Sequence, residues 1–216
     1  MALTFYTGQG SPYGWRVFLA LERKGIPYEL KILSFSEGDT KKPGFRAVNA
    51  RGKVPTIVDD GFVLGESLAI LEYLDERFPD QPKLYRGDAK ARARTRRLIL
   101  EVGEYLNKEG MDPIFAEFFD KGDAAPDAAN VEKARTRIRE ELEFFSKELG
   151  RGPFFGGAEP DALDFVFYPE YAYVKRITFR KPDTRLTELV PKAIAEWGAR
   201  IEALPYFDKT YPAHWR

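Results

Sequence analysis

The sequence contains no cysteine and a single histidine, His214. The missing cysteine excludes disulfides, thiolate zinc sites and cysteine nucleophiles, including mixed-disulfide chemistry with a protein thiol. One histidine is too few for a histidine-rich metal site, and a lone histidine near a chain end is more often a solvated surface residue than a catalyst. We therefore expect a protein that works without a metal ion.

An excess of charge of one sign and long apolar runs are missing as well. Lys and Arg number 34 and Asp and Glu number 34, so a net charge of zero gives no overall attraction to nucleic acid or to a membrane surface. No run reaches the ~18 apolar residues that a membrane-spanning helix needs. The first residues show no basic-then-apolar leader. We expect a cytoplasmic protein whose partners include neither nucleic acid nor a membrane.

Strand and helix signals alternate in the first part of the chain. The expected elements occupy 3–6, 13–24, 28–33, 40–50, 55–64 (a hairpin that turns at Asp60-Gly61) and 66–78. Apolar residues at helical spacing and Gly25 as a stop predict the first helix, and the helix at 40–50 is expected to be irregular. The predicted order is βαβαββα, which indicates an α/β domain.

The signals become almost entirely helical after a proline-containing stretch. Expected helices occupy 89–109, 131–149, 161–176 and 190–204, and the first of these is expected to bend or end near Gly110 and Pro113. The prediction is therefore a first domain at 1–79, a linker at 80–88 and an all-helical domain at 89–216. "DALD", Asp161 to Asp164, predicts a helix-capping box, which is a structural motif.

The stretch "GQGSPYGWRV", Gly8 to Val17, lies between the first strand and the first helix. Its glycines are one residue too far apart for a dinucleotide fingerprint, and Pro12 lacks an amide that would face a phosphate. Ser11 stands where an N-cap belongs, with Pro12 at the first helical position. No histidine or lysine adjoins Ser11 to make it a nucleophile, so its hydroxyl is better suited to hydrogen-bond an anion held at the helix N-terminus.

Two later motifs each allow a structural and a functional interpretation. In "GKVPTIV", Pro55 is either an ordinary trans-proline that begins a strand or a cis-proline that exposes the backbone of Val54 to an extended peptide. In "GESLA", Glu66 and Ser67 open a helix, where they either serve its dipole or hold the ammonium and carboxylate of a ligand. "GESLA" also has the form of a nucleophile elbow, with His214 later in the chain, but the strand before it belongs to a tight hairpin.

Taken together, "SPYGWRVFLALERKGIPYE", "KVPTIVDDGFVLGESLAILEYLDERFP" and "DALDF" resemble the cytosolic glutathione transferases over essentially the whole chain. The similarity is to a bacterial-type member of the serine-type classes (tau-, theta- and zeta-like), although "SPYG" replaces the "SSCS"-type run of the zeta-like isomerases. The resemblance implies a thioredoxin-like domain that binds glutathione, a helical domain that contributes the electrophile site, and a homodimer. Glutathione is then a co-substrate.

The resemblance also implies roles for individual residues. Ser11 would donate a hydrogen bond to the glutathione sulfur and favour its thiolate. The implied glutathione-binding residues are Lys41 (with Lys42 competing), Lys53, Val54, Pro55, Glu66 and Ser67, and the implied electrophile-site residues are Tyr13, Phe115, Phe118, Tyr168 and Tyr171.

The expected function is transfer of glutathione to a hydrophobic electrophile. The alternatives are a non-catalytic binding or interaction module of the same fold, or a specialised glutathione-dependent dehalogenase, ether-cleaving enzyme or isomerase.

Overall fold

The computed structural model describes residues 3–216, which form two compact units. The first unit holds the residues up to Arg86 together with Leu204–Arg216, and the second holds Gly87–Ala203. The prediction placed the end of the chain in the helical domain, whereas Leu204–Arg216 group with the first unit.

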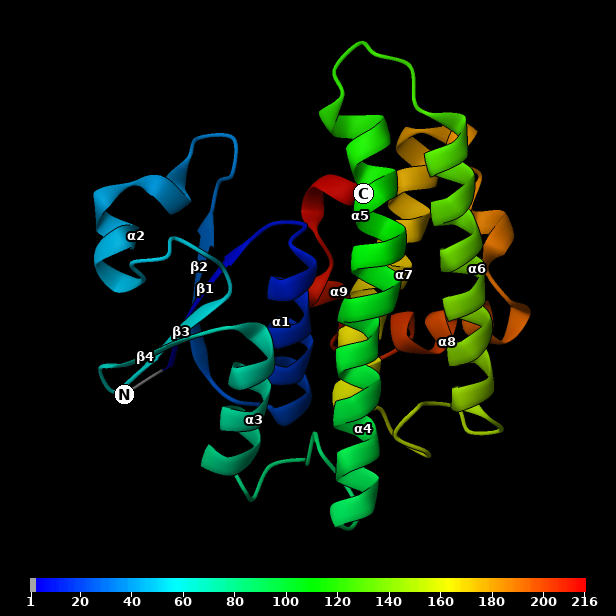
Figure 1. Ribbon diagram of the computed structural model, residues 1–216. Helices are drawn as coiled ribbons and strands as arrows, with labels where there is room; N and C mark the ends of the chain where they lie inside the picture. The colour runs from blue at the N-terminus through cyan, green and yellow to red at the C-terminus, as the bar shows by residue number, and fades with distance from the viewer. Residues whose placement is uncertain (1–2) are drawn as a thin grey trace. The chain divides into compact units, whose positions relative to one another are not determined.

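The first unit has the predicted βαβαββα order (Figure 1). Its elements are β1 (Leu3–Gly8), α1 (Pro12–Lys24), β2 (Tyr28–Leu33), the 3₁₀ turn η1 (Asp39–Lys41), α2 (Pro43–Val48), β3 (Thr56–Asp59), β4 (Phe62–Gly65), α3 (Ser67–Arg77) and, from the chain end, α9 (Phe207–Thr210) and the 3₁₀ turn η6 (Ala213–Trp215). The hairpin between β3 and β4 turns at Asp60 and Gly61, both with positive φ, as the Asp-Gly pair predicts.

The sheet has the order β2-β1-β3-β4, with β1 parallel to β2 and antiparallel to β3. Helices α1 and α3 cover one face and α2 covers the other (Figure 1). Alternate residues of β1 serve these two faces: Phe5 packs edge-on against Phe18 of α1, and Tyr6 packs against Phe45 of α2. This is a thioredoxin-like arrangement, as predicted.

Local signals set both ends of α1. Ser11 is the N-cap, Pro12 occupies the first turn, and Gly25 ends the helix in the left-handed conformation with φ of 62°. The amide of Gly25 donates to the carbonyls of Leu21 and Glu22, which are otherwise left without partners at a helix end. The Ser11 cap starts α1 only three residues after the end of β1 at Gly8.

The second unit is all-helical, as predicted. Its elements are α4 (Ala89–Glu101), the π-helical segment η2 (Val102–Met111), α5 (Asp112–Phe115), the π-helical segment η3 (Ala116–Asp120), α6 (Ala128–Leu149), α7 (Ala162–Arg180), the 3₁₀ turns η4 (Pro182–Thr184) and η5 (Leu186–Leu189), and α8 (Lys192–Glu202). Over residues 3–216, no helix combines the length and the apolar character that crossing a bilayer requires.

The expected end or bend near Gly110 and Pro113 is not a helix end, because the helical path runs on to Asp120. A Cβ added to Gly110 would lie 2.7 Å from Cγ1 of Ile138, so the glycine permits a close approach of α6. Pro113 lies at the junction of the π-helical segment η2 and α5, where the hydrogen-bonding pattern of the continuous helical path changes.

The predicted capping box at Asp161 and Asp164 is confirmed. Asp164 is fully buried and also accepts hydrogen bonds from the indole of Trp197 at 2.7 Å and from the amides of Phe155 and Gly156. This one carboxylate therefore joins the start of α7 to α8 and to the loop before α7. Burial raises the pKa of Asp164.

Candidate functional site

The strand register of the first unit brings three loops to one edge of the sheet. Tyr6 near the end of β1 lies opposite Thr56 at the start of β3, and Thr56 lies opposite Gly65 at the end of β4. The turn after β1, the Val54-Pro55 step before β3 and the Glu66-Ser67 pair after β4 therefore meet at this edge. Three motifs that lie far apart in the sequence become neighbours.

Ser11 is held at this edge by its own helix. It is 9% exposed, and its Oγ accepts a hydrogen bond from the amide of Gly14 at 3.2 Å. A hydroxyl has one proton to donate and two lone pairs, so this bond leaves the proton available. No group among residues 3–216 accepts it. The hydroxyl can therefore donate to a group bound beside the N-terminus of α1.

The peptide bond between Val54 and Pro55 is cis, so the alternative of an ordinary trans-proline does not apply. Val54 is half-buried, and within the described part of the chain nothing hydrogen-bonds to its backbone amide or carbonyl. An unpaired donor and acceptor on one residue match the backbone of an extended peptide.

The side chain of Asn49 makes three hydrogen bonds in the loop that carries Val54, which also receives bonds from the side chains of Arg46 and Thr56. Its Nδ2 donates to the carbonyl of Lys53 at 3.0 Å and to Oγ1 of Thr56 at 2.9 Å, and its Oδ1 accepts from the amide of Arg51 at 3.0 Å. Sequence reasoning missed this residue. Asparagine side chains often bond to nearby backbone groups, so an asparagine beside a glycine-containing loop is the sequence signal that could have identified Asn49.

Glu66 has a positive φ of 64° with ψ of 111°, which is uncommon for a residue other than glycine. It is the N-cap of α3, and the buried Ser67 follows at the first helical position. The amides of this first turn have no partners inside the helix and face any anion placed there. The strand before Ser67 is antiparallel to β3, so the nucleophile-elbow alternative does not fit.

A cavity of about 750 Å³ opens between these loops. It brings together the predicted residues Tyr13, Lys53, Val54, Pro55, Glu66 and Ser67, and its other walls are Asn49, Ala50, Arg51, Leu64 and Gly65. Ser11 is not among its walls and instead lines a separate cavity of about 200 Å³. Tyr13, in the first turn of α1 two residues after Ser11, is 48% exposed and lines the larger cavity, so the N-terminus of α1 lies close to that cavity.

Two cations stand at the larger cavity, the predicted Lys53 and the unpredicted Arg51. Both are exposed, and among residues 3–216 no carboxylate pairs with either side chain. Arg51 was missed because nothing in its local pattern separates it from an ordinary surface arginine. An unpaired arginine and lysine on one loop suit a carboxylate ligand.

Lys41 and Lys42 lie on the neighbouring turn and do not line the cavity. Lys42 is bound to Asp39 at 2.6 Å, and this contact raises the pKa of Lys42 and lowers that of Asp39. In the described part of the chain, Lys41 has no ion pair. Its neighbour Thr40 contacts the cation-bearing loop, because a Cβ on Gly52 would lie 2.5 Å from the carbonyl oxygen of Thr40. Asp39 thus competes for Lys42 and leaves Lys41 available.

Four predicted electrophile-site residues belong to the helical unit. Phe115 is 37% exposed and stacks on Phe119 with ring centroids 4.9 Å apart, and Phe118 is half-buried. Tyr168 and Tyr171 are 1% and 6% exposed.

These two tyrosines are core residues of the helical unit. Both rings lie about 6 Å from that of Trp197, and the hydroxyl of Tyr168 donates to Glu202 at 3.0 Å. Of the two interpretations of these residues, electrophile site or helix core, their burial favours the helix core. The physical reason is that a stripe of aromatic residues at helical spacing most often packs inside a bundle, as it does here along α7.

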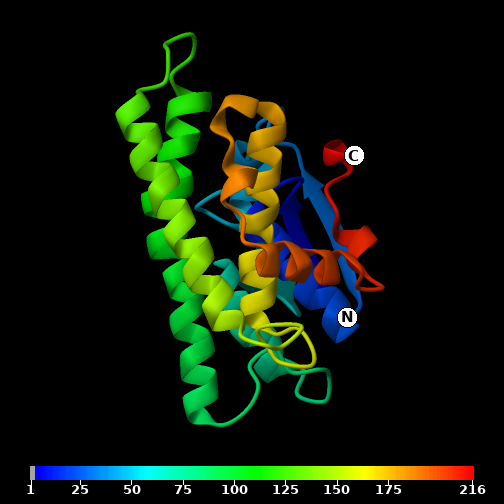
Figure 2. The same ribbon diagram turned by 90° about the vertical axis from the view of Figure 1, so that its right-hand side faces the viewer.

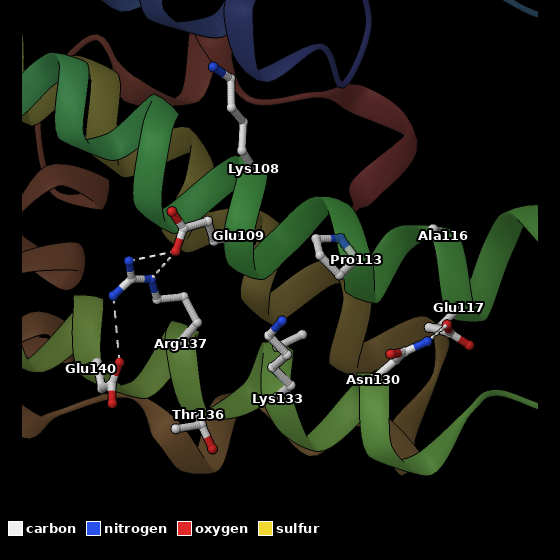
Figure 3. A pocket seen from close by; sticks show the side chains of 11 residues that line it. Lys108, Glu109, Pro113, Ala116, Glu117, Asn130, Lys133, Thr136, Arg137 and Glu140 are labelled. Carbon is white, nitrogen blue, oxygen red and sulfur yellow. Dashed lines mark hydrogen bonds and ion pairs between the residues drawn. The ribbon is translucent and has the colours of Figure 1, made fainter.

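The helical unit has a groove of its own, of about 710 Å³, between η2, α5 and α6 (Figure 3). Its acidic groups are already engaged: Arg137 binds Glu109 at 2.5 Å, and Asn130 donates to Glu117 at 3.1 Å. No activated nucleophile or acid–base pair faces it among the residues that line it. We therefore place the candidate site in the first unit. Residues 3–216 contain no group of three His, Asp or Glu that could hold a metal ion.

The chain is similar to known proteins over both of its units. Residues 10–77 match the family model of the glutathione S-transferase N-terminal domain, and residues 128–213 match that of the C-terminal domain. Human glutathione S-transferase theta-2B is 28% identical over 201 residues, which cover 92% of this chain and 80% of that protein. Maleylacetoacetate isomerase of Pseudomonas aeruginosa is 38% identical over 104 residues, 47% of this chain and 49% of that protein.

A solved structure agrees over the whole length. The crystal structure of a glutathione S-transferase from the Antarctic clam Laternula elliptica superposes with a TM-score of 0.84 and 28% identity, covering 100% of this chain and 94% of that one. The first family match includes every predicted glutathione-binding residue.

Proposed function

Because the chain belongs to the glutathione S-transferase family, we propose that it binds glutathione in the cavity of its first unit and transfers it to a hydrophobic electrophile. The observation that carries this proposal is the meeting of the Ser11 turn, the Val54-Pro55 step and the Glu66-Ser67 pair at one edge of the sheet. Each motif offers groups for a different part of the tripeptide.

The two ends of glutathione carry the charges that the loops complement. Lys53 and Arg51, with Lys41 from the neighbouring turn, bind the glycyl carboxylate at the end where the cavity is cationic. Ser67 and the free amides of the first turn of α3 bind the γ-glutamyl carboxylate, and Glu66 binds the ammonium on the same carbon. The unusual backbone of Glu66 fits this role, because such conformations cluster at ligand contacts.

The middle of the peptide pairs with Val54. The free amide and carbonyl of Val54 bond to the cysteinyl backbone of glutathione as an added strand would, next to Pro55. This fixes the cysteinyl side chain relative to β1 and hence relative to the turn that carries Ser11. Asn49 is a positioning residue for this contact, because it holds the loop from both sides.

Ser11 stabilises the thiolate form of the bound sulfur. A free thiol has a pKa of about 8.5, so at neutral pH only a few per cent is ionised. A hydroxyl bond to a charged acceptor and the N-terminus of α1 together supply roughly 2 kcal/mol, which lowers the thiol pKa by about 1.5. The thiol proton leaves to solvent, and the sulfur forms a bond to the electrophilic carbon as the leaving group departs with the bonding electrons.

The exposed aromatic residues suit an apolar electrophile. Among the predicted electrophile-site residues, Tyr13 lines the same cavity as the proposed glutathione-binding groups. Phe115 and Phe118 remain proposals for the same role, and the buried Tyr168 and Tyr171 do not. We also propose a cytoplasmic homodimer, to which the exposed Phe62 and Val63 on the edge strand β4 contribute apolar surface.

The test is a binding and substrate panel on the purified protein. Calorimetric titration should give saturable binding of glutathione, weakened by Lys53→Ala and not by Lys192→Ala, an exposed lysine of the helical unit. At saturating glutathione, aryl halides, activated alkenes and a cis-to-trans isomerisation substrate separate conjugation from dehalogenation and isomerisation. The similarity to a maleylacetoacetate isomerase justifies the isomerisation arm. Binding without turnover of any substrate would favour the non-catalytic module, and absence of binding would contradict the proposal.

A further inference from the structure

The last residues of the chain are fastened to α1. We call Phe207–Arg216 the C-terminal strap (Figure 2). The indole of Trp15, in the first turns of α1, donates to Oγ1 of Thr210 at 2.9 Å, and both residues are buried. The rings of Phe207, Tyr211 and Trp215 surround that indole with centroids 5.6 to 6.1 Å away. The strap is therefore anchored by a buried hydrogen bond and an aromatic cluster.

A second anchor lies at the other end of α1. Lys209 of the strap pairs with Glu22 at 2.6 Å and lies over the ring of Tyr28, 5.2 Å from its centroid. The hydroxyl of Tyr28 donates to the same carboxylate. The direction of the strap is thus fixed by contacts to both α1 and β2.

The end of the strap lies against the turn that precedes Ser11. Gly10 has φ of +77°, and a Cβ built on it would lie 2.9 Å from Cε1 of His214 and 3.1 Å from Nε1 of Trp215. The two rings therefore occupy the space beside the α-carbon of Gly10, next in the chain to Ser11. A side chain at this position is disfavoured both by the backbone conformation and by the rings.

The Gly8–Ser11 turn is also held at its first residue, where Gly8 pairs with Leu33 of β2 and lies against the ring of Phe35. It contains Gly8 and Gly10, and one backbone hydrogen bond, from the amide of Ser11 to the carbonyl of Gly8 at 3.1 Å, closes it. The cavity of about 200 Å³ adjoins it, lined by Gly8, Gly10, Ser11 and strap residues 209–213. A glycine-rich turn beside open space has room to move unless a neighbour restrains it.

We propose that His214 is a positioning residue for Ser11. Its ring, carried by the strap, restrains the Gly8–Ser11 turn in the conformation that directs the Ser11 hydroxyl at the bound sulfur. The role is one of shape and needs neither a proton nor a charge on the imidazole. The inference rests on the proposed function of Ser11, and it assigns a role to His214, which is exposed in the structure as the sequence predicts.

The experiment compares His214→Ala with His214→Phe, which keeps a flat ring and removes the nitrogens. His214→Ala should speed hydrogen exchange at the amides of Gly10 and Ser11, lower kcat/KM for conjugation by about three- to tenfold and move its pH profile toward higher pH. His214→Phe should stay close to the unmodified protein in all three. In a Ser11→Ala background, His214→Ala should cost nothing further, because the two residues act through one hydroxyl.

Gly10→Ala tests the same contact from the other side. It should lower kcat/KM more than Gly25→Ala, a matched control at the far end of α1 with φ of +62° and nothing within 4 Å of the added Cβ. Equal effects of the two changes would overturn the proposal.

Three further results would overturn it: exchange and pH profile unaltered in His214→Ala, His214→Phe as impaired as His214→Ala, or additive losses in the Ser11→Ala background. If Ser11→Ala itself leaves conjugation unaltered, the proposed function of Ser11 fails, and the hydrogen-exchange comparison still decides whether His214 restrains the turn.

Discussion

Replacing Asn49 by alanine should weaken glutathione binding although this side chain is not proposed to touch the ligand. The change removes three hydrogen bonds, to the carbonyl of Lys53, to Oγ1 of Thr56 and from the amide of Arg51. Two of these are exposed to solvent, so about 0.5 kcal/mol each is appropriate, and the part-buried bond to Thr56 contributes about 1 kcal/mol. The total of roughly 2 kcal/mol is what the Asn49 side chain contributes to the observed form of the loop.

If the loop must adopt that form before glutathione binds, the loss appears in the dissociation constant. About 2 kcal/mol corresponds to roughly a thirtyfold weaker complex, which is an upper value because a partly ordered loop still binds. Calorimetric titration of glutathione measures the dissociation constant, and urea unfolding monitored by circular dichroism checks that the first unit stays folded.

Asn49→Asp is the matched control for the direction of the hydrogen bonds. It keeps the acceptor for the Arg51 amide, loses both donors and sets a carboxylate against the carbonyl of Lys53 beside the proposed carboxylate site, so it should bind glutathione no better than Asn49→Ala. An Asn49→Ala protein that binds glutathione with unaltered affinity would refute the view that this side chain organises the binding loop.

Two further predictions concern the helical unit. The Lys121 ammonium and the Asp127 amide hold the pKa of Glu117 at about 2, below its ordinary 4.5. The stability that Glu117 contributes is therefore complete above pH 4.5 and is lost as the pH falls through 2. Glu117→Gln should flatten the decline of the unfolding free energy between these pH values, and an unaltered decline would contradict the assignment. Asp164→Ala removes the acceptor for three backbone amides and for the indole of Trp197, so urea unfolding should show a loss above about 3 kcal/mol, and a loss below 1 kcal/mol would show that other groups take over.

The fold of the first unit follows closely from local sequence signals. Ser11, Gly25 and the Asp60-Gly61 pair mark the ends and the turn where the structure has them, because capping and positive φ depend on a few adjacent residues. The helical path beyond Gly110 could not be predicted in the same way. Glycine and proline are local stop signals, and packing against Ile138 of α6 overrides them.

The site was partly predictable for a related reason. Ser11, Lys53 and Ser67 stand in short motifs with recognisable chemistry, so their residue types and spacing point to them. Asn49 and Arg51 act through the shape of a loop, which no local pattern encodes.

The contact between the end of the chain and the Ser11 turn could not be predicted from the sequence. Trp15 and Thr210 are 195 positions apart, and no periodicity connects them. His214 is exposed, as expected for a residue near the chain end, and only the tertiary structure shows that its ring also lies beside Gly10.

The most direct test of the account is the ionisation of enzyme-bound glutathione, followed by its ultraviolet thiolate absorbance as a function of pH. In the unmodified protein the midpoint should lie one to two units below that of a free thiol, about 8.5. Ser11→Ala should raise the midpoint by about one unit, and Ser11→Thr, which keeps the hydroxyl and the cap, should hardly move it. A Ser11→Ala protein that binds glutathione and ionises it at the unmodified midpoint would contradict the central claim that the Ser11 hydroxyl stabilises the thiolate.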